Sequence, residues 1–435
     1  MSEPGSTPAG PLRDVRVVEW SNSVSAPFCG KLLGELGADV IKIEPPGRGE
    51  ASRSSGPFPN REPHPERSGL FLFANLNKRG MTLDLETEAG RGLLDRLLES
   101  ADVFLENQPL ELLDRTRLDY QSLQARHPRL VATSISPYGR SGPYKHYKGT
   151  GLTVDALGGL SFGTGFPARE PLRTPLHQTS YLAGVGAAFA TIVALLGRDL
   201  TGRGQQVDVA EAQVVGTLLT GYHLPTYIYR GIAGFRSGNR MRLGLFPNCV
   251  LPCRDGYVCI DAPQLEQYQR FLNLLGDQEW MQEPRYRDRR AMSDQYPEEA
   301  EALIAPWFME HSKEEILRLC LDNRVPCVPV LTFDEVLSNT QLNSRDYFQE
   351  IGHPEAGDFR YPGPPYRLSA SPVRMVRAAP TLGQHTREIL CDELGLDTIE
   401  TGAAIAVYMD SGGMSYGDAE GAKKLLRDDI VTGSE

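Results

Sequence analysis

The stretch DVRVVEWSNSVSAPFCGKLLGELGADVIKI, residues 14–43, decides the fold of this chain. It opens with a β-rich run from Asp14 to Trp20, continues with apolar residues at helical spacing from Pro27 to Leu36, and closes with a second β-rich run from Asp39 to Ile43. A strand, a helix and a strand in this order place the two strands parallel, joined by a right-handed crossover. We therefore predict a β-α-β unit at the start of the first domain.

The same alternation continues downstream. The segments that repeat it are a strand at 81–85 (MTLDL), a helix at 90–100, a strand at 101–105 (ADVFL) and a strand at 130–135 (LVATSI). Such alternation predicts the α/β class, with a doubly wound, Rossmann-like domain. Residues 21–30, which follow the first strand, lack the G-x-G-x-x-G spacing of a dinucleotide site, so we do not expect a nicotinamide cofactor.

The residue composition of the sequence changes after residue 224, and this change defines the predicted domain boundaries. A turn signal at Arg254-Asp-Gly256 between two apolar runs predicts a hairpin, and Pro and Gly are frequent from Thr332 to Pro380. The predicted parts are a disordered lead at 1–10, a large Rossmann-like domain at 11–224, a linker at 225–240, a small α+β domain at 241–331, a return segment to the large domain at 332–395, and a tail at 396–435 that ends in a short helix.

Composition excludes several classes of function. Asp and Glu number 56 against 45 Lys and Arg, which gives a formal net charge of −11 and argues against a nucleic-acid-binding surface. The seven cysteines are scattered, and Cys249, Cys253 and Cys259 lack the spacing of a zinc site, so we expect reduced thiols, no metal and a cytoplasmic location. The most apolar segment, 181–196, is expected to be a buried helix rather than a membrane span.

Several motifs follow one another between Gly10 and Gly395. They include LGELGADVIKIEPPG at 33–47, NLNKR at 75–79, SISPYGRSGP at 134–143, SYLAG at 180–184, RDLTGRGQQVD at 198–208 and PTLGQH at 380–385. In content and order these motifs resemble those of the class III CoA-transferases, the CaiB/BaiF family. The resemblance implies a Rossmann-like large domain, a smaller α+β domain, an interlocked dimer, and CoA lying against the large domain with its thioester near Ser180.

Ser180 is the main departure from the family pattern. In the family, an aspartate stands four residues before the glycine that corresponds to Gly184, and it takes the acyl group. The relay needs a carboxylate, because the enzyme forms first a mixed anhydride and then a thioester with CoA, and a seryl oxygen cannot carry CoA in this way. We therefore expect no catalytic residue in this chain and interpret Ser180 as a helix N-cap.

A racemase branch of the same family gives no better assignment. On that branch a histidine and an aspartate are the opposing acid and base, and their positions fall at Thr150 and Ser180 in this sequence. Since neither residue exchanges protons with a carbon acid near neutral pH, we do not expect racemization.

The resemblance also implies residues that contact CoA. Asn-Lys-Arg at 77–79 is suited to phosphate, and two further positions match residues near CoA in relatives. However, Gln108 replaces an aromatic residue and Pro45 replaces a common arginine, which removes adenine stacking and a positive charge. We therefore expect that this chain binds CoA weakly. The predicted CoA-binding residues are Lys78, Arg79, Asn107 and Lys148.

Taken with these departures, the resemblance implies a noncatalytic subunit of a heteromeric CoA-transferase. It resembles a branch of the family in which two unequal subunits move CoA between an acyl-CoA such as succinyl-CoA and an organic acid such as benzylsuccinate. A paralogous partner would carry the aspartate that Ser180 replaces, and CoA would be a substrate rather than a permanent cofactor. Two alternatives stay open: an active homodimer that uses another carboxylate or a ternary-complex route, and a CoA-binding scaffold or sensor without turnover.

Overall fold

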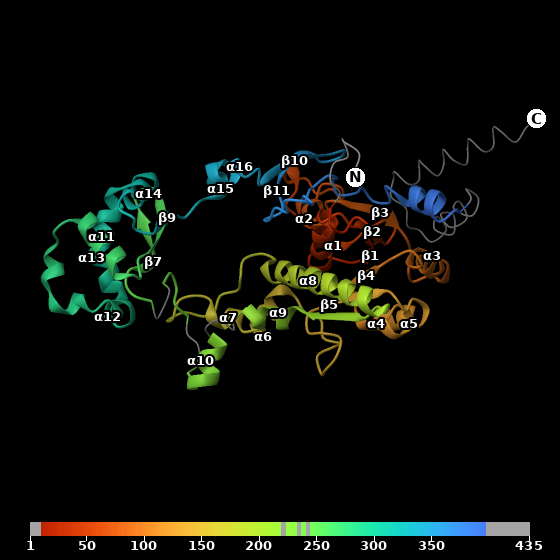
Figure 1. The fold of residues 1–435 in the computed structure, drawn as a ribbon, viewed down its shortest axis with the longest axis horizontal. Helices are drawn as coiled ribbons and strands as arrows, with labels where there is room; N and C mark the ends of the chain where they lie inside the picture. The colour runs from red at the N-terminus through yellow and green to blue at the C-terminus, as the bar shows by residue number, and fades with distance from the viewer. Residues whose placement is uncertain (1–9, 219–222, 233–235, 241–243, 397–435) are drawn as a thin grey trace, which may run out of the picture. The chain divides into compact units, whose positions relative to one another are not determined.

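The computed structural model describes residues 10–218, 223–232, 236–240 and 244–396 (Figure 1). Most of the predicted lead at 1–10 and nearly all of the predicted tail at 396–435, with its terminal helix, lie outside these residues. The described residues form two compact units. The first unit comprises those within 1–160, 174–220 and 344–435, and the second comprises those within 161–173 and 221–343. The predicted small domain, 241–331, falls inside the second unit, which also takes in 161–173 and extends to Asn343.

A six-stranded parallel sheet organises the first unit. The order β3-β2-β1-β4-β5-β6 is that of a doubly wound dinucleotide-type fold, with the reversal of strand order between β1 and β4. The predicted α/β, Rossmann-like fold class is therefore confirmed. The strands are β1 Arg16–Trp20, β2 Asp39–Glu44, β3 Lys78–Thr82, β4 Val103–Glu106, β5 Val131–Ser136 and β6 Gln206–Ala210.

The third strand lies earlier than predicted. It pairs with β2 from Val40 opposite Lys78 to Glu44 opposite Thr82, whereas the sequence pattern placed it at 81–85. After Thr82 the chain leaves the sheet, and the Asp84 carboxylate accepts a hydrogen bond of 3.0 Å from the Glu86 amide in the turn that follows. The prediction failed because Leu83 and Leu85 are buried in this turn and therefore continue the apolar pattern of the strand.

Helices cover both faces of the sheet, and alternate strand residues point to opposite sides. In β1, Val17 packs with the buried residues of α1 and α8, whereas Val18 and Trp20 pack with leucines of α3, α4 and α5. The helices of the first unit are α1 Ser25–Glu35, α2 Gly69–Ala74, α3 Glu88–Leu98, α4 Leu110–Thr116, α5 Tyr120–Arg126, α6 Gly151–Leu157, α8 Gln178–Thr201 and α9 Glu211–Leu218, with 3₁₀ turns at Ala51–Ser54 and Pro59–Arg61 and a π-helical turn at Glu388–Glu393.

Helix α8 is the one described helix that is long and apolar enough to cross a membrane. One side of it packs on α1 and the sheet through small residues such as Gly184 and Ala187. Figure 1 shows where α1 and α8 lie in the first unit. The prediction of a buried helix is correct for this side only. The other side exposes an apolar stripe, which consists of Val185, Phe189, Val193, Leu196 and Leu200, each 50–89% exposed.

The second unit is built on a three-stranded antiparallel sheet in the order β7-β8-β9. The predicted hairpin is present, with Arg254 and Asp255 in its turn, and it packs against helices through buried side chains such as Ile260, Phe271 and Phe308. The elements are β7 Asn248–Cys253, β8 Gly256–Asp261, β9 Cys327–Pro329, α10 His223–Arg230, α11 Leu265–Leu275, α12 Arg289–Asp294, α13 Pro297–Glu310, α14 Lys313–Asp322 and α15 Phe333–Ser338, with α7 Leu160–Gly163 and α16 Thr340–Ser344 where the chain passes between the units and 3₁₀ turns at Glu279–Gln282 and Pro284–Arg287.

The return segment contains a folded part that the sequence analysis did not predict. Strands β10 Phe348–His353 and β11 Gly357–Pro362 pair antiparallel, and the turn between them ends at Gly357, which has a φ of +87°. Tyr361 of this hairpin packs in a buried cluster with Phe71 and Leu72 of α2. The Pro- and Gly-rich sequence of this segment did not signal the hairpin, because the strands are short and the residues that cover them lie far away in the sequence.

Candidate functional site

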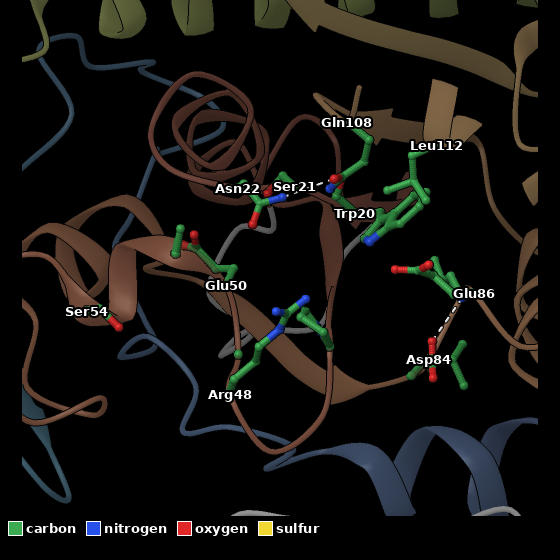
Figure 2. Close-up of a pocket in the computed structure, with 15 residues that line it drawn as sticks. Trp20, Ser21, Asn22, Arg48, Glu50, Ser54, Asp84, Glu86, Gln108 and Leu112 are labelled. Carbon is green, nitrogen blue, oxygen red and sulfur yellow. Dashed lines mark hydrogen bonds between the residues drawn. The ribbon is translucent and has the colours of Figure 1, made fainter. Parts of the chain in front are cut away.

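A cavity of about 340 Å³ lies at the carboxyl ends of β1, β2, β3 and β4 (Figure 2). This edge includes the point where the strand order reverses, which is where doubly wound folds bind their ligands. The volume lies within the range of small-molecule sites. The fifteen lining residues are Trp20, Ser21, Asn22, Pro45, Arg48, Gly49, Glu50, Ala51, Ser54, Leu83, Asp84, Leu85, Glu86, Gln108 and Leu112.

Two amide side chains brace the loops that follow β1 and β4. Asn107 accepts a hydrogen bond of 2.8 Å from the Asn22 amide and donates one of 2.7 Å to the Asn22 carbonyl. Asn22 in turn donates to Gln108 Oε1 at 3.0 Å, and Gln108 Nε2 donates to the Trp20 carbonyl at 3.1 Å. Asn107, predicted to bind CoA, therefore fixes the wall of the cavity without being one of its lining residues, whereas Gln108 forms part of that wall.

The charged groups around the cavity are mostly acidic. Glu50, Asp84 and Glu86 line it, and Arg48 is the one basic side chain among the fifteen lining residues. Glu86 also forms an exposed ion pair of 2.6 Å with Arg115. In Figure 2, Arg48 reaches into the cavity between Glu50 on one side and Asp84 with Glu86 on the other.

Lys78, predicted to bind phosphate, lies inside the protein. Its side chain is fully buried, and the ammonium donates to Glu19 Oε1 at 2.9 Å, to the Pro27 carbonyl at 2.7 Å and to Asn75 Oδ1 at 2.8 Å. Burial lowers the pKa of Lys78 to about 8, although the Glu19 carboxylate acts in the opposite direction. All three ammonium protons are thus used within the fold, and Lys78 does not line the cavity.

Arg79 is likewise engaged inside the first unit. Its guanidinium binds Asp39 with two hydrogen bonds of 2.9 and 2.7 Å, Glu388 at 2.8 Å, and Glu393. Burial opposes its charge, but these carboxylates raise the pKa of Arg79 overall. Lys148 is exposed between β5 and α6 and does not line the cavity. The assignment of these residues to CoA stays a prediction.

Ser180 lies in the first turn of α8 but does not cap it. The helix begins at Gln178 and its N-cap is His177, which makes no capping hydrogen bond through its side chain. The predicted N-cap role was therefore wrong, because the helix starts two residues earlier than Ser180. The turn is fixed instead by Thr179, whose hydroxyl donates to the buried carboxylate of Asp155 on α6.

Glu211 is a buried carboxyl group that the sequence pattern did not single out. It is the first residue of α9, which packs against α8, and it is 8% exposed. Burial raises the pKa of Glu211, and the Ser25 side chain at the start of α1 only partly opposes that effect. The Ser25 carbonyl touches α8 at Gly184, where a Cβ atom would lie 2.7 Å from the oxygen, and Gly184 is one turn beyond Ser180.

A signal for Glu211 was present in the sequence. An acidic residue directly follows the run QVDVA at 206–210, and side chains at the carboxyl end of a parallel strand face the ligand edge of the sheet. The contact with Ser25, which lies far upstream, could not be found in this way.

Comparison with known proteins agrees with this architecture. The model of CoA-transferase family III matches residues 12–386. The succinyl-CoA–D-citramalate CoA-transferase of Chloroflexus aurantiacus is 33% identical over 390 residues, which cover 89% of this chain and 95% of that protein. The succinyl-CoA:(R)-benzylsuccinate CoA-transferase subunit BbsE of Thauera aromatica is 32% identical over 394 residues, which cover 87% and 93%.

The fold is also similar to that of a solved structure. The crystal structure of a CaiB/BaiF family protein from Brucella suis superimposes with a TM-score of 0.80 at 29% identity, and the match covers 89% of this chain and all of that chain. The ordered motifs, the doubly wound sheet and these likenesses agree over nearly the whole sequence. The chain belongs to CoA-transferase family III.

Proposed function

We propose that this chain is a noncatalytic subunit of a heteromeric CoA-transferase that moves CoA between an acyl-CoA such as succinyl-CoA and an organic acid such as benzylsuccinate. The proposal rests on Ser180 in the first turn of α8, which by its spacing from Gly184 we assign to the position of the family's aspartate. A paralogous chain with aspartate at that position supplies the missing group.

The chemistry assigns the covalent steps to the partner chain. Its aspartate attacks the thioester carbonyl, the C–S bond breaks, and CoA leaves as the thiolate while a mixed anhydride forms. The thiolate then attacks the aspartyl carbonyl and releases the first carboxylate, which leaves an enzyme thioester. The incoming carboxylate attacks this thioester, displaces CoA thiolate and forms a second anhydride. The thiolate then attacks the acyl carbon of the incoming acid, and the aspartate leaves as a free carboxylate.

The likeness to BbsE supports a heteromer, since that protein's name describes it as one subunit of a CoA-transferase. The exposed apolar stripe on α8 gives further support, because a contiguous apolar surface of this kind is typical of an interaction face. We propose that the partner chain covers it in an interlocked dimer. The seven cysteines are all free thiols, which favours a reducing, cytoplasmic location.

Native mass spectrometry of the protein purified gently from its own host tests the proposal. We expect a mass equal to this chain plus a related chain with aspartate at the position of Ser180. In the complex, exchange of that aspartate for alanine should abolish CoA transfer, whereas Ser180→Ala in this chain should leave kcat within about twofold. A homodimer with full transferase activity would overturn the heteromer, and acyl-CoA binding without turnover or a paralogous partner would favour a scaffold or sensor.

A second candidate function is an active homodimer that uses another carboxylate, and Glu211 is the observation that favours it. The group is buried on α9, which packs against α8, and it has no ion-pair partner among the described residues. If the pure chain transfers CoA, Glu211→Gln should abolish that activity, and hydroxylamine should trap an acyl group on the wild-type protein but not on the variant. Activity that survives Glu211→Gln would exclude this carboxylate.

A further inference from the structure

The cavity at the sheet edge has few positive charges for a ligand that carries several phosphate groups. Coenzyme A has a diphosphate and a 3′-phosphate, and proteins usually hold such groups with Arg, Lys or backbone amides. Lys78 and Arg79, the two cations that the sequence suggested, are engaged with Glu19 and Asp39 inside the fold. Any phosphate contact in the cavity must therefore come from another residue.

Several observations point to Arg48. It is the one basic side chain among the lining residues, and Figure 2 shows its guanidinium directed into the cavity. The side chain is exposed, and within the described part of the chain it forms no ion pair or hydrogen bond. A planar guanidinium with free donors matches the geometry of a phosphate group.

Hydrogen bonds and a close approach to Arg53 order the loop that carries Arg48. The Arg48 and Gly49 amides donate to the carbonyls of Pro46 and Pro45 at 2.8 and 3.0 Å, and Gly47 and Gly49 have φ values of +70° and +66°. A Cβ atom on Gly49 would lie 2.4 Å from Cδ of Arg53, so glycine is required for this close approach.

Beneath the loop, Arg53 binds Glu44 through two hydrogen bonds of 2.7 Å, and both side chains are fully buried. The Glu50 amide also donates to Glu44 at 3.0 Å. The backbone at Arg48 is thus ordered before a ligand arrives, and binding needs to fix only the Arg48 side chain. Preorganisation of this kind lowers the entropic cost of the contact.

We infer that Arg48 binds a phosphate group of CoA in this chain. The inference rests on the proposed transferase function and deepens it by naming a contact for its substrate. Arg48 lies three residues after Pro45, in the loop that follows β2. Because Asp84 and Glu86 lie on the opposite wall, the cavity favours one phosphate group at Arg48 and repels a second near that wall.

Isothermal titration of the purified native protein with CoA and with 3′-dephospho-CoA tests the inference. We expect Arg48→Met to weaken CoA binding about tenfold, which corresponds to about 1.4 kcal/mol. Arg48→Lys should fall between wild type and Arg48→Met, because lysine keeps the charge but not the planar fork. Arg13→Met, a change at an exposed residue outside the cavity, is the matched control and should alter affinity by less than twofold.

The two ligands identify which phosphate is bound. If Arg48 holds the diphosphate, Arg48→Met weakens both ligands equally. If it holds the 3′-phosphate, loss of that phosphate weakens wild-type binding and Arg48→Met has no further effect. Wild-type affinity of Arg48→Met for both ligands would overturn the inference, as would absence of binding to the wild-type chain. Neither result would bear on the proposed heteromer, which is tested by the mass of the complex and by the activity of the partner's aspartate.

Discussion

Glu44 and Arg53 form a fully buried ion pair directly under the loop that carries Arg48. Burial by itself would raise the pKa of Glu44, but Arg53, with help from Lys42 and the Glu50 amide, lowers it overall. A carboxylate with a lowered pKa stabilises the fold above its unfolded pKa of about 4.5, and this contribution is lost as the pH falls through the lower folded value. The free energy of unfolding should therefore decrease on acidification below about pH 4.5.

Urea unfolding at a series of pH values measures this contribution. Arg53→Met should cost about 3–5 kcal/mol at pH 7, because it leaves the buried Glu44 carboxylate without its ion-pair partner and also removes the ion pair with Glu66. In this variant burial raises the pKa of Glu44. On acidification the free energy of unfolding of the variant should therefore decrease less than that of the wild type, or should increase. The double variant Glu44→Gln with Arg53→Met should recover most of the stability, since it removes both charges. An unchanged acid dependence in Arg53→Met would contradict the assignment.

At the scale of the element, α8 depends on a close approach to α1. A Cβ atom on Gly184 would lie 2.7 Å from the Ser25 carbonyl oxygen, and that backbone atom cannot move aside without shifting α1. Gly184→Ala should therefore lower the free energy of unfolding by about 1–3 kcal/mol. Gly186→Ala is the matched control on the same helix, because the nearest atom to its Cβ would lie 3.5 Å away. It should be neutral or stabilise by up to about 1 kcal/mol, through the better helix propensity of alanine.

Chemical denaturation of both variants measures these two changes in the free energy of unfolding. Equal effects at the two positions would show that helix propensity, rather than contact between α1 and α8, governs the stability of this element. Since the Ser25 side chain acts on the pKa of Glu211, a Gly184→Ala protein that folds should show altered chemical shifts for the Glu211 side chain.

At the scale of the whole molecule, the apolar stripe on α8 predicts that the chain associates through this helix. Phe189 is 71% exposed at its centre. Phe189→Asp should prevent assembly of the interlocked complex, because it places a charge in the proposed interface. Sedimentation velocity of the variant should then show single chains, while the circular dichroism of the whole protein stays unchanged. Leu321→Asp, at a position 65% exposed on α14, is the control and should leave the mass of the complex unchanged. A Phe189→Asp protein with the mass of the wild type would exclude this face as the contact.

The sequence by itself determined the α/β class of the first unit and its opening β-α-β unit, but not the bounds of β3 or the β10-β11 hairpin. The runs at 14–20 and 39–43 became β1 Arg16–Trp20 and β2 Asp39–Glu44, and the helix between them became α1 Ser25–Glu35. It also determined the absence of aspartate at position 180, and with it the question of where the reacting carboxylate lies. These features are local, because the period of apolar residues records which side of a strand or helix is buried.

Only the tertiary structure decided which charges face a ligand. Lys78 and Arg79 form a basic pair in the sequence, but Glu19 lies 59 residues away from Lys78, and Glu388 lies 309 residues away from Arg79. Arg48, in contrast, carried no signal until its loop was placed over the cavity. A basic side chain has the same local pattern whether its partner is a buried carboxylate or a phosphate, because the partner comes from distant segments that only the fold brings together.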